Sequence, residues 1–82
     1  MKVQWRRRAE KDHEQLDRTV RDRVLAAIVH FASTGRGDIR RLEAITPPLF
    51  RLRVGDIRVL FSVPENDTMI VERVLPRDKA YK

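Results

Sequence analysis

The stretch Pro48-Leu-Phe-Arg-Leu-Arg-Val-Gly-Asp-Ile-Arg-Val-Leu-Phe-Ser-Val63 consists of two alternating runs on either side of Gly55-Asp56. A two-residue loop that begins with glycine is typical of a tight β-hairpin, because the primed turns need a positive φ at that position. Closing this turn pairs Val54 with Ile57 and Arg53 with Arg58. The stretch therefore predicts two antiparallel strands, around which the rest of the chain is arranged.

This pairing gives the predicted hairpin two unlike faces. One face carries Arg51, Arg53 and Arg58, and Arg53 stands directly opposite Arg58. Like charges opposite each other on a ladder destabilise it, by up to ~1 kcal/mol. We therefore expect this face to bind an anion, with phosphate as the first candidate, whereas a solvated strand face is the alternative. The other face is entirely apolar and consists of Phe50, Leu52, Val54, Ile57, Val59 and Phe61.

Two amphipathic helices are expected before the hairpin. The first runs from Arg7 to Leu16, with Ala9, His13 and Leu16 as a narrow inward stripe. His13 is expected to be a partly buried structural residue rather than a metal ligand or a base.

The second helix has a clearer start at Thr19, because Asp22 follows three residues later in the capping pattern. Gly35 is a natural stop, and His30 is expected on the helix surface. The two segments predict a helical hairpin that packs on a sheet. The apolar positions of the second helix recur at the helical period and are Val20, Val24, Leu25, Ile28, Phe31 and Ala32.

Two further strands are expected outside the hairpin. Met1–Trp5 fits a short first strand, and Thr68–Leu75 follows a turn over Pro64–Asp67. Because Thr68–Leu75 is apolar on both faces, it is typical of a central strand. Residues 35–48 are expected to form an irregular connection. Its expected anchors to the core are Ile39, Leu42 and Ile45.

The resulting order of elements is β-α-α-β-β-β. It predicts an α+β fold, in which a helical hairpin packs on one face of a four-stranded antiparallel sheet. The arginines then line the other face as a basic concavity. At 82 residues, the chain has the length of one domain, residues 1–82.

The net positive charge indicates which classes of partner the chain can bind. The chain has 18 Lys and Arg against 12 Asp and Glu, a net charge of +6, and fourteen of the cations are arginine. Arginine is favoured where phosphate is bound through two parallel hydrogen bonds. The excess of arginine is consistent with RNA, DNA or an acidic protein as partner, although a basic chain can also be merely soluble.

Several classes of protein are excluded by the sequence. There is no cysteine, so neither disulfides nor thiolate metal sites are expected. No segment resembles a signal peptide or a membrane span, and a cytoplasmic protein without membrane contact is expected. The chain has no phosphate-binding loop, no metal-ligand spacing and no nucleophilic triad, so we expect neither metal nor cofactor.

The residues that remain still allow RNA to be cleaved. The 2′-hydroxyl of RNA is the nucleophile, so the protein need only hold the scissile phosphate, neutralise its transition state and move protons. Clustered guanidinium groups meet the first two needs. Tyr81 can serve as a base, since nearby cations stabilise its phenolate, or its ring can stack on a nucleobase. Alternatively, Tyr81 simply packs against the core.

The stretch Leu49–Phe61 resembles the central hairpin of the RelE/ParE superfamily of bacterial toxins, and Arg77-Asp-Lys-Ala-Tyr81 is similar to its terminal Arg…Tyr element. The resemblance extends to Trp5 with Ala9–Asp12 and Leu16, and to the connection Gly35–Asp38. It covers essentially the whole chain. It implies a toxin that a cognate antitoxin neutralises in a type II toxin–antitoxin pair.

RelE-like members of this superfamily cut mRNA in the ribosomal A site without a metal ion. The resemblance implies that Arg58 and Arg77 contact the scissile phosphate and that Tyr81 is the general base or positions the 2′-hydroxyl. It also implies that RNA phosphate is bound by Arg51, Arg53, Lys79 and Lys82.

ParE-like members share the fold but inhibit DNA gyrase without cutting RNA, and they are the alternative. Two further alternatives are a non-catalytic member that acts only through its antitoxin complex and a free-standing RNA-binding module. We expect the antitoxin to be acidic where it covers the arginines and the apolar groove beside them.

Overall fold

The alternating stretch forms the hairpin that its sequence predicts. In the computed structural model, which describes residues 1–80, β3 (Leu49–Val54) and β4 (Ile57–Glu65) pair antiparallel. The pairs run from Val54 with Ile57 to Phe50 with Phe61. Gly55 has a φ of 59°, as a tight turn beginning with glycine requires. The predicted register is therefore confirmed.

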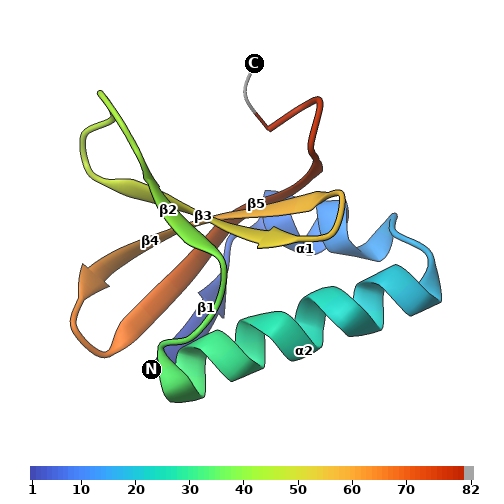
Figure 1. Cartoon of the computed structure of the whole chain (residues 1–82), viewed down its shortest axis with the longest axis horizontal. Helices are drawn as coiled ribbons and strands as arrows, with labels where there is room; N and C mark the ends of the chain where they lie inside the picture. Colours follow the sequence, from blue (N-terminus) through green and yellow to red (C-terminus); the bar gives the residue numbers. More distant parts are fainter. Residues whose placement is uncertain (81–82) are drawn as a thin grey trace.

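The hairpin is the centre of a five-stranded sheet with the order β1-β5-β4-β3-β2 (Figure 1). Its other strands are β1 (Lys2–Trp5), β2 (Ile39–Leu42) and β5 (Thr68–Pro76). The α+β class is confirmed, and β5 lies between β1 and β4 as a central strand should. The sheet differs from the predicted one in two respects: it has five strands rather than four, and β1 pairs with β5 in parallel.

The additional strand, β2, lies in the stretch that was expected to be an irregular connection. Its four residues, Ile39-Arg-Arg-Leu42, have no apolar alternation, so no local pattern predicts a strand. It forms because it pairs with the exposed edge of β3, with Ile39 opposite Leu52 and Arg40 opposite Arg51. This pairing satisfies backbone groups that an unpaired edge leaves open.

A register shift in β5 explains why its inward positions cannot be read from an alternating pattern. Leu60 pairs with Arg73, but the next residue of β4, Phe61, pairs with Val71. β5 therefore has one extra residue, Glu72, at this point. As a result Val71 and Val74 are both buried in the core, although strict alternation places them on opposite faces.

Helices α1 (Arg7–Glu14) and α2 (Arg18–Thr34) precede the sheet strands β2 to β5. The first turn of α2 is capped by Asp17, whose Oδ1 accepts a hydrogen bond from Val20 N at 2.9 Å. The expected start at Thr19 is therefore wrong by two residues, because Asp17 is an equally good N-cap and comes first. Gly35 ends α2 in the left-handed conformation, φ 73°, as predicted.

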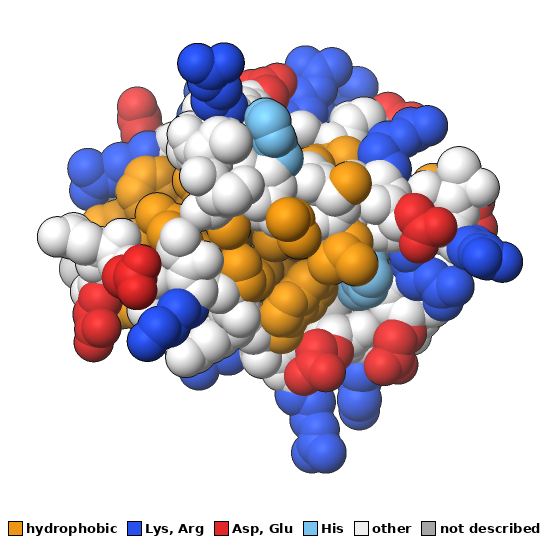
Figure 2. Space-filling model, turned by 90° about the horizontal axis from the view of Figure 1, so that it is seen from below, with side chains coloured by type: hydrophobic (Ala, Val, Ile, Leu, Met, Phe, Trp, Pro, Cys, Tyr) orange, Lys and Arg blue, Asp and Glu red, His pale blue; other side chains and the backbone are white. Residues whose placement is uncertain are grey.

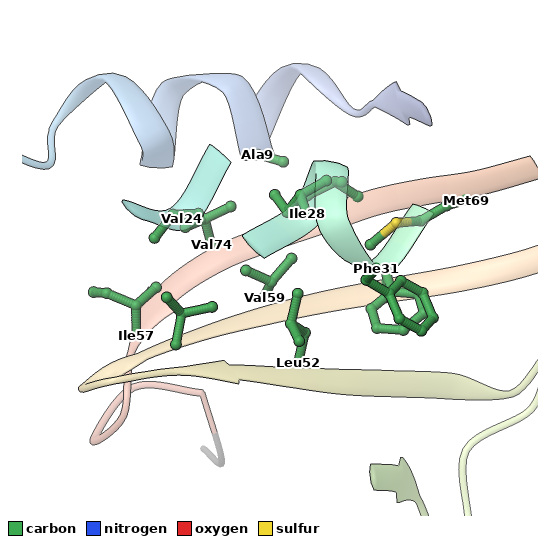
Figure 3. Close-up of a cluster of buried hydrophobic side chains, with 12 residues drawn as sticks. Ala9, Val24, Ile28, Phe31, Leu52, Ile57, Val59, Met69 and Val74 are labelled. Atoms are coloured by element: carbon green, nitrogen blue, oxygen red, sulfur yellow. The ribbon is translucent and has the colours of Figure 1, made fainter. Parts of the chain in front are cut away.

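The core lies between the helices and one face of the sheet (Figure 3). Of the expected anchors in the 35–48 stretch, Ile39 packs against this core but Ile45 is exposed. Neither α1 nor α2, the helices of the described residues, is long and apolar enough to cross a membrane. The core is formed by Ala9, Val24, Ile28, Phe31, Leu52, Val54, Ile57, Val59, Phe61, Met69, Val71 and Val74.

An ion pair attaches α1 to the irregular part of β5. The Nε of Arg73 donates to Asp12 Oδ2 at 2.7 Å and its Nη2 donates to Oδ1 at 3.0 Å. Val74 N also donates to Asp12 Oδ2, at 3.0 Å. Burial raises the pKa of Asp12, but the hydrogen bonds and positive charge of Arg73 and the bond from Val74 outweigh it and hold the pKa below its usual value.

We predict that Asp12→Asn lowers the free energy of unfolding at neutral pH by about 1–3 kcal/mol, since it removes the charge and an acceptor of a partly buried pair. The pKa of Asp12 is lower in the folded chain, so its stabilisation is complete above the unfolded value of about 3.9 and disappears as the pH falls through the folded value. Urea unfolding of both proteins across this range measures the difference.

The matched control is Asp22→Asn, which changes one exposed carboxylate on α2. It should behave like the wild type at every pH. A difference between Asp12→Asn and wild type that persists unchanged into strong acid would show that the ion pair does not stabilise the fold through its charge.

The N-cap assignment gives a second prediction. Asp17→Ala should lower the free energy of unfolding by about 0.5–2 kcal/mol, because Val20 N loses its acceptor. Thr19→Ala, inside the first turn, should cost less than about 0.5 kcal/mol. Thermal and denaturant unfolding of the two variants distinguish the caps, and a larger loss in Thr19→Ala would contradict the observed helix start.

Candidate functional site

Four arginines share the face of the sheet that points away from the helices. Arg51 and Arg53 alternate along β3 with buried core residues, and cross-strand pairing places Arg40 opposite Arg51 and Arg58 opposite Arg53. We call these four residues the arginine face. The hairpin pattern brings three of them together, whereas Arg40 was not anticipated because β2 was not.

The guanidinium groups of the hairpin differ in accessibility. The side chain of Arg53 is 55% exposed and that of Arg51 is 12% exposed, while Arg58 as a whole is only 5% exposed. Arg58 Nη1 donates to the carbonyl oxygens of Gly55 at 2.8 Å and Ile57 at 3.2 Å. Its Nε is buried without a hydrogen-bond partner among the described residues. Arg58 thus contacts its own turn, and Arg53 is the more accessible member of this cross-strand pair.

A carboxylate lies between two of these arginines. Asp38, just before β2, has its Oδ1 3.2 Å from Arg51 Nη2 and its Oδ2 4.0 Å from Arg53 Nη1. Its backbone oxygen also accepts a hydrogen bond from Arg53 N at 3.0 Å. The sequence offered no signal for this contact, since it depends on β2 lying beside β3.

The segment after β5 runs on the side of the sheet opposite α2 (Figure 1). Arg77 N donates to Asp56 O at 2.8 Å, which attaches this segment to the hairpin turn that Arg58 also contacts. Arg77 and Lys79 are exposed. Two of the expected site residues, Tyr81 and Lys82, lie outside the described residues.

An apolar groove of about 880 Å³ begins where the arginine face ends. Leu49, two residues before Arg51 on β3, lines it, and so do Ser62 and Ile70, which pair across β4 and β5. Glu72 stands at its rim, where its carboxylate accepts from Arg6 Nε at 3.1 Å and from Ser62 Oγ at 2.9 Å. The remaining lining residues are Ile45, Pro47, Pro48, Phe50, Val63 and Pro64.

A second apolar surface lies on the opposite side of the molecule. Seen from the side of α2, exposed hydrophobic side chains gather between charged ones (Figure 2). Leu25 and Val29 of α2 are the large exposed residues there, and they line a shallow hollow together with Ala26 and His30. His30 is on the helix surface, as predicted.

The contacts of His13 are those of a residue with a structural role. Its Nε2 is 3.1 Å from Arg21 O and its ring lies 5.2 Å from that of Trp5. It is partly buried, as predicted, and its contacts are with α2 and β1. Within residues 1–80, no three His, Asp or Glu side chains are grouped as metal ligands.

The chain matches one protein-family model and several solved structures. Residues 3–81 match the family model described as the ParE toxin of the type II toxin–antitoxin system parDE. No curated protein matches the chain by sequence.

Solved structures match over nearly the whole chain. The RelB–RelE antitoxin–toxin complex of Methanococcus jannaschii is 24% identical, with a TM-score of 0.77, over 98% of this chain and 96% of that one. The RelE–RelB complex of Pyrococcus horikoshii is also 24% identical, with a TM-score of 0.77, over 96% and 97%. A copper-bound mutant toxin from Helicobacter pylori is 15% identical, with a TM-score of 0.76, over 99% of each chain.

These likenesses show a common fold, and the family match adds the sequence relationship over almost every residue. The chain belongs to the ParE toxin family within the RelE/ParE superfamily, and is a toxin of a type II toxin–antitoxin system.

Proposed function

We propose that this toxin is a RelE-like endoribonuclease that cuts mRNA on the ribosome in the cytoplasm. The observation that carries the proposal is the arginine face, which contains two like-charged cross-strand pairs. One of them, Arg53 with Arg58, lies next to the hairpin turn to which the Arg77 segment is attached. Cations placed opposite each other destabilise a sheet, and a phosphate chain relieves that repulsion. Fixed guanidinium groups also stabilise the charge that develops on a phosphate under attack.

The roles of the residues follow from their accessibility. Arg53 is open to solvent and makes the first contact with RNA phosphate, together with Arg51. Arg58 binds the scissile phosphate after its Nη1 leaves the carbonyl oxygens of Gly55 and Ile57. The second group at that phosphate is Arg77, held at the turn through its backbone.

The substrate supplies the nucleophile, its 2′-hydroxyl, so the protein needs no metal ion or cofactor for this reaction. Tyr81 takes the proton from that hydroxyl or positions it. Lys79 and Lys82 bind the flanking RNA backbone through charge, which is the usual sequence-independent part of nucleic-acid binding.

We further propose that a cognate antitoxin covers this side of the molecule. The RelE chains of Methanococcus jannaschii and Pyrococcus horikoshii were solved in complex with RelB. The arginine face and the apolar groove adjoin each other, so an antitoxin segment with acidic residues followed by apolar ones matches both.

Inhibition of DNA gyrase without RNA cleavage is the second candidate. Two observations favour it: the matching family model describes ParE toxins, and Arg58 is buried and bonded to its own turn. In that case the arginine face is an interaction surface and not a catalytic one.

The experiment that tests the proposal is primer extension on an mRNA during translation in a purified system. We expect new 3′ ends at A-site codons that depend on ribosomes. Arg58→Lys and Tyr81→Phe should each lower the cleavage rate by about 10²–10³-fold, the usual loss when one transition-state contact is removed. Arg18→Lys, an exposed change in the first turn of α2, is the matched control and should cleave like wild type.

Two results would contradict the nuclease proposal. One is an intact message with translating ribosomes; the other is full toxicity of Arg58→Lys and Tyr81→Phe in cells. A supercoiling assay on purified gyrase then decides the second candidate, for which both variants should remain inhibitory.

A further inference from the structure

Asp38 occupies the position that an anion would take between two arginines of the arginine face. Its two carboxylate oxygens are 3.2 Å from Arg51 Nη2 and 4.0 Å from Arg53 Nη1. A phosphate bound by the same two guanidinium groups needs the same space. The carboxylate and the phosphate are both anions, so they exclude each other by charge as well as by volume.

The backbone fixes the position of Asp38. Its carbonyl oxygen accepts a hydrogen bond from Arg53 N at 3.0 Å, which ties the residue to β3. The preceding residue, Gly37, lies so close to β3 that a Cβ atom added to it would be 2.9 Å from Leu52 Cδ1. The chain therefore passes close to the sheet at residue 37 and places the carboxylate of the next residue over Arg51 and Arg53.

The carboxylate can nevertheless be displaced. The Asp38 and Arg53 side chains are each 55% exposed, and an ion pair open to water is weak. The Arg51 side chain is only 12% exposed, but the carboxylate that it contacts belongs to the exposed Asp38 side chain. Rotation of the Asp38 side chain into solvent takes the carboxylate away from both guanidinium groups without disturbing the backbone bond to Arg53. The structure thus combines a fixed backbone with an exchangeable carboxylate.

We propose that Asp38 is an internal competitor for phosphate at Arg51 and Arg53, and that it makes this site selective for polyanions over single phosphate ions. A single phosphate gains little by exchanging with a tethered carboxylate. A nucleic-acid strand makes further contacts along the arginine face, and these drive the exchange. The inference rests on the proposed function only in taking phosphate groups as the ligand.

The test measures binding of a short, fluorescently labelled single-stranded oligoribonucleotide by anisotropy at several salt concentrations. Asp38→Asn should bind about five- to tenfold more tightly at low salt, because a negative charge next to the phosphate is removed. Glu65→Gln removes an equal charge from an exposed residue at the far end of β4, and should change the affinity less than twofold. Asp38→Glu keeps the charge and should stay within twofold of wild type.

The double variant Asp38→Asn with Arg53→Gln locates the effect. It should not show the tighter binding of the oligoribonucleotide that Asp38→Asn shows, because the phosphate site opened by Asp38→Asn includes Arg53. Equal or weaker binding by Asp38→Asn, or a gain that survives Arg53→Gln, would overturn the proposal. If Asp38→Asn binds equally or more weakly, Asp38 positions the guanidinium groups and does not compete with phosphate.

A second readout does not depend on RNA. Inorganic phosphate, compared with chloride at equal ionic strength, should raise the melting temperature of Asp38→Asn more than that of wild type. A larger rise for Asp38→Asn, together with an intact message in the ribosome assay, would support competition by Asp38 and contradict the nuclease proposal. The opposite result is also informative. If wild type cleaves mRNA on the ribosome but Asp38→Asn changes neither RNA binding nor the melting temperature in phosphate, the nuclease proposal stands and the competition by Asp38 is rejected.

Discussion

The register of the β3–β4 hairpin is the constraint on which the rest of the structure depends. The turn at Gly55 fixes it, and side chains alternate along a strand, so a slip of one residue exchanges the two faces of the hairpin. In the observed register Leu52 and Val59 pair on the core side and Arg53 and Arg58 on the other. The apolar half provides the burial that stabilises the fold, and this burial holds the arginines opposite each other despite their repulsion.

The parts of the fold that the sequence predicts are those encoded by local patterns. The hairpin, both helices and the central position of β5 follow from alternation, from helical period and from Gly35. The strand β2 and the parallel pairing of β1 do not, because they depend on the edge of a distant strand. The extra residue in β5 also escapes prediction. It becomes visible only through the partner strand and through Asp12, which bonds Arg73 and Val74 beside it.

The residues of the candidate site also form two groups, those that a local pattern predicts and those that depend on a distant strand. Arg51, Arg53 and Arg58 could be placed on one face because the turn determines their register. Arg40 and Asp38 could not, because both reach this face through β2. The burial of Arg58 was equally hidden, since alternation gives the direction of a side chain but not its hydrogen bonds to Gly55 and Ile57.

The arginine face of the free toxin is partly neutralised by the protein itself, and this bears on how it can act. Arg58 donates to carbonyl oxygens of its own hairpin, and the carboxylate of Asp38 lies against Arg51 and Arg53. Exchanging such contacts for phosphate contacts yields little net free energy, because one set of hydrogen bonds replaces another. The binding energy that opens the face must therefore come from additional contacts, either of a nucleic-acid strand along the arginine face or of a larger partner beyond it. For the proposed nuclease we therefore expect cleavage where a ribosome holds the message and little cleavage of free RNA.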